Sequence, residues 1–226
     1  MNYRTFAPRY MWRRLKQLYF QKSNPELPWL AENTIMILSE WLKAGDSGFE
    51  YGSGRSTLWL ANRIEHLVSV EHDEQWFEKV GKNISRSQLA EKVDYRHCTI
   101  DKYPDVIKDF PNESFDFILV DGKKRLECMA NSVAKLKPGG LLILDNANRF
   151  LPNKSLNNFS AFYDYTEKPR PEWAAFTDSI SNWRTFFASD GILDTRFWIK
   201  PSSMKCEMEI KKNVVAGYKQ GNDLVL

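Results

Sequence analysis

The sequence predicts an α/β protein in which a mostly parallel sheet carries helices on both faces. Short apolar segments rich in Val, Ile, Leu, Phe or Tyr alternate with helical patterns along the chain, as expected for buried parallel strands joined by helices. A turn with two glycines follows the first of these segments. Acidic residues stand at or near the carboxyl ends of four segments, which is the side where open α/β sheets bind ligands.

The expected elements follow one another without an internal repeat. Each expected strand is a short apolar run, and each expected helix shows a longer helical pattern. We expect strands at 47–52, 67–72, 93–98, 115–121 and 140–145, and helices at 31–43, 55–64, 74–83 and 125–136. The last two strands are expected at 172–180 and 194–200, with 181–185 between them.

Residues 151–173 follow the fifth expected strand and are rich in aromatic residues. We expect a helix here that packs Phe159 and Phe162 on the sheet. The alternative is that aromatic side chains of this segment stack on a sugar or an aromatic ligand. The aromatic residues concerned are Phe159, Phe162, Tyr163, Tyr165 and Trp173.

Composition favours a globular enzyme. The chain has 226 residues, of which 42% are hydrophobic and 27% charged, which is enough for one domain with a sizeable core. A net charge of +3 is too small to indicate nucleic-acid binding by itself. Three widely spaced cysteines without a CxxC pair favour reduced thiols and argue against a zinc site. Since no apolar run could span a bilayer and no signal peptide is recognisable, we expect a cytoplasmic protein.

The glycine turn at 49–57 carries most of the functional information. Gly52 and Gly54 let the backbone turn sharply and approach a ligand. Glu50 would repel the pyrophosphate of a dinucleotide, whereas S-adenosylmethionine (SAM) offers an ammonium group and a sulfonium cation. Thr57 also stands where the dinucleotide fingerprint has its third glycine. The turn therefore predicts SAM rather than NAD.

A second acid fits the ribose of such a cofactor. Glu71 ends the second expected strand, 17 residues after Gly54. This is close to the spacing at which an acid reaches ribose hydroxyls, and a carboxylate accepts two hydroxyl donors well. The alternative is a helix N-terminal acid, favoured by the helix dipole.

Two further acids end strands in the same way. Asp121 closes 115–121 and Asp145 closes 140–145. Because the carboxyl ends of parallel strands meet at one edge, Glu50, Glu71, Asp121 and Asp145 should converge on one crevice. Four acids at four strand ends exceed what folding alone requires.

The motif order FEYGSGRS, VSVEHD, FDFILVDG and LKPGGLLILDN resembles that of the class I SAM-dependent methyltransferases, over roughly residues 30–150. The resemblance implies a Rossmann-like, seven-stranded, mostly parallel sheet with an antiparallel last strand. Glu71 falls on the ribose acid, His72 beside adenine, and Asp101 near the adenine amino group. Ser56 replaces the third glycine of the loop. The cofactor-binding residues expected from this match are Glu50, Tyr51, Gly52, Ser53, Gly54, Ser56, Glu71, His72, Asp101 and Asp121.

The resemblance also suggests a metal site. Asp121, Asp145 and Asn146 offer oxygen donors suited to Mg²⁺, and their pattern is similar to that of cation-dependent O-methyltransferases. In that comparison Lys124 falls on the catalytic base, with Asp121 and Asp145 positioning the acceptor. The basic run 122–125 departs from the pattern and also resembles bacterial methyltransferases without an assigned metal. In the alternative interpretation, Asp121 contacts cofactor, Asp145 caps a loop and 123–125 is a solvated helix start.

We expect methyl transfer to a hydroxyl of a small or glycan-linked acceptor. Lys123, Lys124 and Arg125 would attract an anionic acceptor, or else form a solvated face. A nucleic-acid methyltransferase is the second hypothesis, but nucleic acid is not an expected partner because no Asn-Pro-Pro-Tyr-like tetrad is present. A SAM-binding module without turnover is the third.

Three regions are expected: an N-terminal extension at 1–28, a methyltransferase domain at 29–201 and a polar tail at 202–226. Residues 1–22 interleave basic and aromatic side chains and contain no acid. We favour a helix that packs beside the cofactor pocket. Peripheral membrane contact and RNA binding are the alternatives for this extension.

Overall fold

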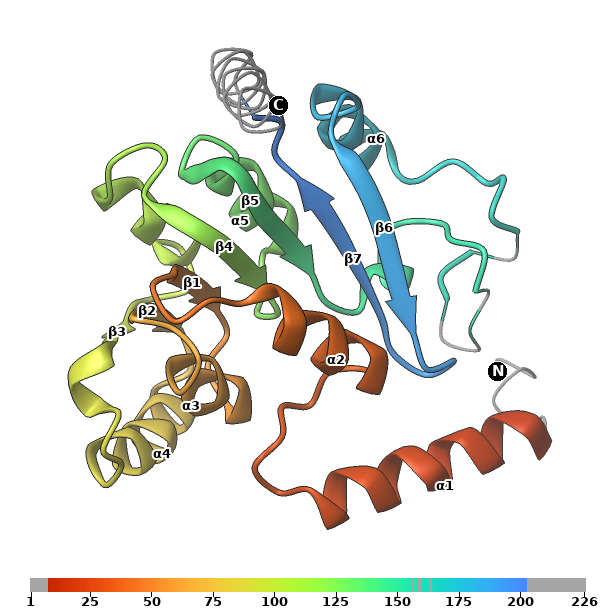
Figure 1. Ribbon diagram of the computed structural model, residues 1–226. Helices are drawn as coiled ribbons and strands as arrows, with labels where there is room; N and C mark the ends of the chain where they lie inside the picture. Colours follow the sequence, from red (N-terminus) through yellow and green to blue (C-terminus); the bar gives the residue numbers. More distant parts are fainter. Residues whose placement is uncertain (1–7, 156, 158–159, 163, 203–226) are drawn as a thin grey trace, which may run out of the picture.

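The computed structural model of the protein describes residues 8–155, 157, 160–162 and 164–202. A seven-stranded sheet forms its centre (Figure 1). The strands are β1 (Ser47–Tyr51), β2 (His66–Glu71), β3 (Val93–His97), β4 (Phe115–Val120), β5 (Leu136–Leu144), β6 (Arg184–Ser189) and β7 (Asp194–Ile199).

The sheet has the order β3-β2-β1-β4-β5-β7-β6. β7 is antiparallel to β5 and β6, and the pairs formed by β1 to β5 are parallel. In this order β2 and β3 lie on one side of β1, whereas β4 and β5 lie on the other side. The strand order therefore reverses between β1 and β4, and such a switch point opens the crevice in which α/β proteins bind ligands. The expected Rossmann-like fold, including its antiparallel last strand, is confirmed.

Helices cover both faces of the sheet. The α-helices are α1 (Pro8–Ser23), α2 (Glu32–Trp41), α3 (Arg55–Ala61), α4 (Glu74–Ser85), α5 (Arg125–Ser132) and α6 (Pro171–Ser179). Short 3-10 helices are η2 (Ala90–Lys92), η3 (Tyr103–Asp109) and η4 (Ala147–Arg149). Within the described part of the chain, no helix has the length and apolar character needed to cross a bilayer.

Alternate residues of the central strands supply two hydrophobic cores. In β4, Ile118 and Val120 point into the core that includes residues of α5 and α6, whereas Phe117 and Leu119 point into the core shared with α2 and α3. All four side chains are fully buried. This alternation explains why β4 is almost continuously apolar, since both of its faces are covered.

The expectation of a strand at 172–180 is wrong, because residues 171–179 form α6. Pro171 occupies the first turn, where a missing N–H has no consequence. Trp173 and Phe176 are three residues apart, share one helix face and are both buried. The sixth strand instead begins at Arg184, inside the segment expected to separate the last two strands.

The helix expected within 151–173 is also absent from the described residues of that segment that precede α6. Phe162 is nevertheless buried, as expected. Phe159 and Tyr163 lie outside the described residues, as does the tail from residue 203. The expected division into three regions therefore stays a prediction.

Candidate active site

The glycine loop after β1 is pressed against the end of β4. Gly52 has a φ of +94°, and a Cβ there would lie 2.8 Å from the Gly122 nitrogen. Only glycine combines this backbone conformation with this contact. Gly54 differs, because a Cβ there would meet no atom within 4 Å. Gly54 thus leaves open space at the mouth of the loop, as a cofactor cradle requires.

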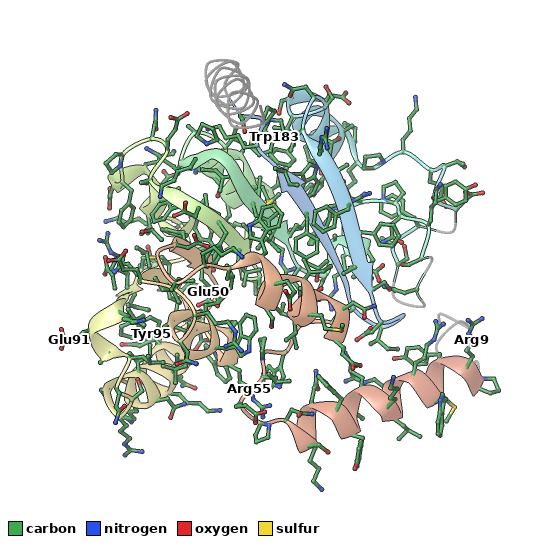
Figure 2. All side chains as sticks on the ribbon, in the orientation of Figure 1. Arg9, Glu50, Arg55, Glu91, Tyr95 and Trp183 are labelled. Carbon is green, nitrogen blue, oxygen red and sulfur yellow. The ribbon has the colours of Figure 1, made fainter. Side chains whose placement is uncertain are left out.

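Glu50 belongs to β1 and lies inside the molecule (Figure 2). Its Oε2 accepts 2.6 Å hydrogen bonds from the hydroxyls of Thr57 and Ser69. Thr57 Oγ1 in turn accepts a hydrogen bond from the Gly54 N–H at 3.0 Å, which ties the carboxylate to the loop. Burial raises the pKa of Glu50, while hydrogen bonds from Ser56, Ser69 and Thr57 lower it.

Glu50 Oε1 is buried and has no hydrogen-bond partner among the described residues. An unsatisfied carboxylate oxygen in the interior is costly, and a cation placed against it removes that cost. This orphaned oxygen fits the ammonium group of SAM. The expected role of Glu50 is therefore compatible with the geometry.

Glu71 is 4% exposed and holds the loop from the other side. Its Oε2 accepts hydrogen bonds from the backbone N–H and the hydroxyl of Ser53, both at 3.2 Å. Its Oε1 accepts bonds from the His72 and Asp73 N–H groups at 2.8 and 3.0 Å. Glu71 therefore joins the glycine loop to the turn after β2.

The other expected cofactor residues differ in how they lie. Tyr51 is fully buried and donates its hydroxyl to the Pro104 carbonyl at 2.9 Å, so only its backbone faces the loop. The His72 ring lies 5.3 Å from the Tyr103 ring, at the ends of β2 and η3. Asp101 is 90% exposed and pairs with Lys124 at 3.3 Å rather than lining a closed pocket.

Asp121 and Asp145 are brought together as expected. They follow Val120 and Leu144, which are register partners in β4 and β5. Burial raises the pKa of both carboxyls, and the charge of Asp145 raises that of Asp121 further.

Arg125 joins the ends of these two strands, a role that the sequence did not single out. Its Nη2 donates to Asp121 Oδ1 at 2.9 Å and to the Asp121 carbonyl at 2.7 Å. Its Nη1 donates to the Asp145 carbonyl, and its Nε donates to the Gly122 carbonyl at 2.9 Å. Arg125 is therefore not a free cation for an acceptor. Its spacing of four residues from Asp121 at a helix start is the signal that sequence inspection could have used.

Three of the four carboxylate oxygens expected to hold Mg²⁺ are engaged within the protein. Asp145 accepts hydrogen bonds from Thr195 at 2.8 Å and from the Asn146 amide at 2.6 Å, while Asp121 pairs with Arg125. Within the described ranges, no group of three or more His, Cys, Asp or Glu side chains is arranged to hold a metal ion. A guanidinium already balances the carboxylates, so this donor set does not fit a divalent cation. We derive no chemical step through a metal.

A cavity of about 550 Å³ opens between the turn after β4, the start of α5 and the first turn of α6. Asp121 contributes one wall, and the basic residues Lys123, Lys124 and Arg149 contribute others. Trp173 also lines it and stacks on Phe150 with the ring centroids 4.9 Å apart. This volume accommodates a small ligand or one sugar-sized group.

Comparison with known proteins agrees with this geometry. Residues 49–147, which include all four converging acids, match the model of a family described as a methyltransferase domain. A search of curated proteins finds no match.

Several solved structures share the fold. An O-methyltransferase from Bacillus cereus in complex with SAH has a TM-score of 0.55 and 18% identity, covering 83% of this chain and 90% of that one. The O-methyltransferase TomG from Streptomyces achromogenes, involved in tomaymycin synthesis and in complex with SAM, has a TM-score of 0.55 and 16% identity, covering 83% and 89%. A SAM dependent methyltransferase from Aquifex aeolicus has a TM-score of 0.51 and 14% identity, covering 81% and 96%.

At identities this low, the similarity to these structures shows the fold alone. The match to the methyltransferase domain covers the residues of the glycine loop and the acids at the strand ends. The seven-stranded, mostly parallel sheet and the antiparallel β7 are those implied by the motif series. The chain therefore has the fold of the class I SAM-dependent methyltransferases, and its residues 49–147 match a methyltransferase domain.

Proposed function

We propose that the protein transfers a methyl group from SAM to a hydroxyl group of a small or glycan-linked acceptor. The observation that carries this proposal is the contact between the glycine loop and the end of β4. Gly52 packs on the backbone of Asp121 and Gly122, and Asp121 also lines the 550 Å³ cavity. The cofactor loop and a carboxylic acid that faces an acceptor cavity are therefore neighbours.

Bound SAM would supply a methyl group on a sulfonium, which is already an excellent leaving group. The protein then has to hold the acceptor in line with that methyl group and remove the hydroxyl proton. The acceptor oxygen forms the new bond to carbon, and the carbon–sulfur electron pair stays on sulfur. Glu50 would bind the ammonium group of SAM through Oε1, which has no hydrogen-bond partner among the described residues. Glu71 would bind the ribose of SAM through Oε2, which now accepts a hydrogen bond from Ser53.

Asp121 is the stronger of the two candidate bases. Its raised pKa makes the ionised carboxylate a better proton acceptor than an ordinary aspartate. Lys124 Nζ is instead paired with Asp101 at 3.3 Å. We therefore assign proton removal to Asp121. Asp145 and Arg125 position it, and Lys124 contacts the acceptor.

An anionic group on the acceptor fits the cavity. Lys123, Lys124 and Arg149 place three cations along its wall, which also carries the carboxylates of Asp121, Glu127 and Glu172. A carboxylated sugar or a phosphate-bearing metabolite would pair with these cations, and a ring of the acceptor would pack beside Trp173.

The proposal is tested by transfer of radiolabelled methyl from SAM into fractionated lysate, with wild-type protein and with Asp121→Asn. We expect label in the small-molecule or glycan fraction, and a loss of at least 100-fold with the variant, within the usual range for removal of a general base (~10²–10⁴). Label in the nucleic-acid fraction would contradict the proposed acceptor class. Equal turnover by Asp121→Asn would exclude Asp121 as the base.

A further inference from the structure

Helix α1 turns its apolar face away from the protein. Five large hydrophobic side chains are exposed there, at positions that recur with the period of an α-helix and so form one stripe. We call this set the α1 stripe: Met11 (54% exposed), Trp12 (71%), Leu15 (60%), Leu18 (45%) and Tyr19 (74%).

The opposite face of the helix is the one that packs. Tyr10 and Gln17 are buried, and Arg13, Phe20 and Gln21 are partly buried. A helix held only by the hydrophobic effect would bury its most apolar face, whereas α1 buries a glutamine and leaves two aromatic residues in solvent. Packing against the protein therefore leaves the α1 stripe unexplained, and a contiguous apolar patch of this kind marks an interaction surface.

The charges that α1 itself carries beside the α1 stripe are all positive, although Lys16 also lies 4.0 Å from the carboxylate of Glu32 in α2. Residues 1–22 contain no Asp or Glu. Arg9 and Lys16 border one side of the α1 stripe, Arg14 borders the other, and Lys22 stands within its last turn. Figure 2 shows Arg9 at the N-terminal end of α1. The partner of this surface must therefore be apolar and anionic.

We propose that α1 docks the protein on an anionic lipid membrane, lying in the interface with the α1 stripe inserted among the headgroups. Amphipathic helices with Trp and Leu on one face and Lys or Arg beside it bind membranes in this way without spanning them. Trp12 and Tyr19 suit the interface because their rings are apolar with one polar atom. A second copy of the chain fits less well, since pairing along the α1 stripe would bring acid-free, basic flanks together.

The helix lies along the functional edge of the sheet. Arg55, the first residue of α3 after the glycine loop, donates a 3.2 Å hydrogen bond to the Gln21 carbonyl. The guanidinium of Arg13 lies over Gly191, in the turn between β6 and β7. That turn follows β6, which is parallel to β5, so both contacts are at the carboxyl ends of these strands. Docking would hold the crevice beside the lipid surface, although the docking inference does not depend on the proposed reaction.

The test is cosedimentation of the full chain with vesicles of neutral phosphatidylcholine, alone or with 30 mol% phosphatidylglycerol, a composition chosen to approximate an anionic leaflet at roughly physiological charge. We expect binding to the anionic vesicles that weakens as salt is raised, and little binding to the neutral ones. Leu15→Glu should reduce partitioning at least ~10-fold. Met36→Glu, at an exposed methionine of α2, is the matched control and should bind like the wild type.

Because Leu15 is exposed, Leu15→Glu should keep its thermal unfolding temperature and its affinity for SAM, so lost vesicle binding cannot be ascribed to misfolding. Unchanged vesicle binding by Leu15→Glu would overturn the proposal, as would no binding by the wild type. Light scattering that shows a wild-type dimer dissociated by Leu15→Glu would assign the α1 stripe to self-association and overturn it too.

Discussion

Gly52 and Gly122 meet backbone to backbone, so that a Cβ on Gly52 would lie 2.8 Å from the Gly122 nitrogen. This contact joins the turn after β1 to the turn after β4. It also explains why the first glycine of the loop is a structural requirement, whereas the second, Gly54, faces open space. The two glycines should therefore respond differently to the same substitution.

Gly52→Ala should destabilise the fold by about 1–3 kcal/mol, because alanine is strained at positive φ and its methyl group would collide with β4. Gly54→Ala should leave stability within about 0.5 kcal/mol, since its φ is extended and its surroundings are open. Gly54→Ala should instead weaken SAM binding, because the methyl group enters the cradle. Denaturant unfolding and SAM titration of both variants measure this. Equal losses of stability in Gly52→Ala and Gly54→Ala would contradict the different roles assigned to the two glycines.

The raised pKa of Asp121 predicts a specific pH dependence of stability. Below pH 3.8, the ordinary pKa of an aspartate, both the folded and the unfolded state hold this proton, and its contribution to folding is fully present. As pH rises from 3.8 through the higher folded pKa, the folded state binds more protons than the unfolded state, so stability falls. Asp121→Asn removes this titration.

The free energy of unfolding of Asp121→Asn, relative to wild type, should therefore rise across that pH window. Asp178→Asn removes an exposed carboxyl on α6 and measures the effect of losing any carboxyl. A difference between wild type and Asp121→Asn that stays constant with pH would show that burial does not raise the pKa of Asp121.

Arg125 should contribute to the stability of the fold as well as to the candidate active site. Arg125→Ala leaves Asp121 and Asp145 without their compensating cation and leaves carbonyls of both strand ends unpaired. We expect a loss of roughly 3 kcal/mol in the free energy of unfolding. Lys123→Ala, at an exposed neighbour, should cost little. Arg125→Ala as stable as Lys123→Ala would show that the guanidinium does not hold the strand ends.

Turnover should not depend on a divalent cation. Because Arg125 and the donors of Thr195 and Asn146 occupy the relevant oxygens, EDTA should leave the rate within about twofold, and added Mg²⁺ should not raise it. The readout is methyl transfer after the acceptor class has been identified. Activity that EDTA abolishes and Mg²⁺ restores would mean that the carboxylates rearrange around a metal.

The sequence predicted the parts of the molecule in which local pattern and tertiary role coincide. β1, β2, β4 and β5 are apolar because both faces are covered, and their terminal acids converge because parallel strands share an edge. It failed at 172–180, where Trp173 and Phe176 could be assigned to a strand or to a helix, and Pro171 decides for the helix.

Other features depend on contacts that no single sequence contains. Tyr51 follows Glu50 and was expected at the cofactor, but its side chain finds the Pro104 carbonyl, 53 residues away. Arg125 was expected to be available to an anionic acceptor, but two strand ends meet it only in the folded sheet. The α1 stripe required the structure as well, because the sequence does not say which face of a helix is buried.

The most direct test of the account is calorimetric titration of SAM into the wild type and Glu50→Gln. Glutamine keeps the size of the side chain and an oxygen for Thr57 and Ser69 but offers no charge to an ammonium group. We expect SAM to bind the wild type and Glu50→Gln to raise the Kd at least ~10-fold, which corresponds to about 1.4 kcal/mol, while Glu40→Gln at an exposed site of α2 leaves it unchanged. No binding of SAM by folded wild-type protein, or equal affinity in Glu50→Gln, would contradict the account.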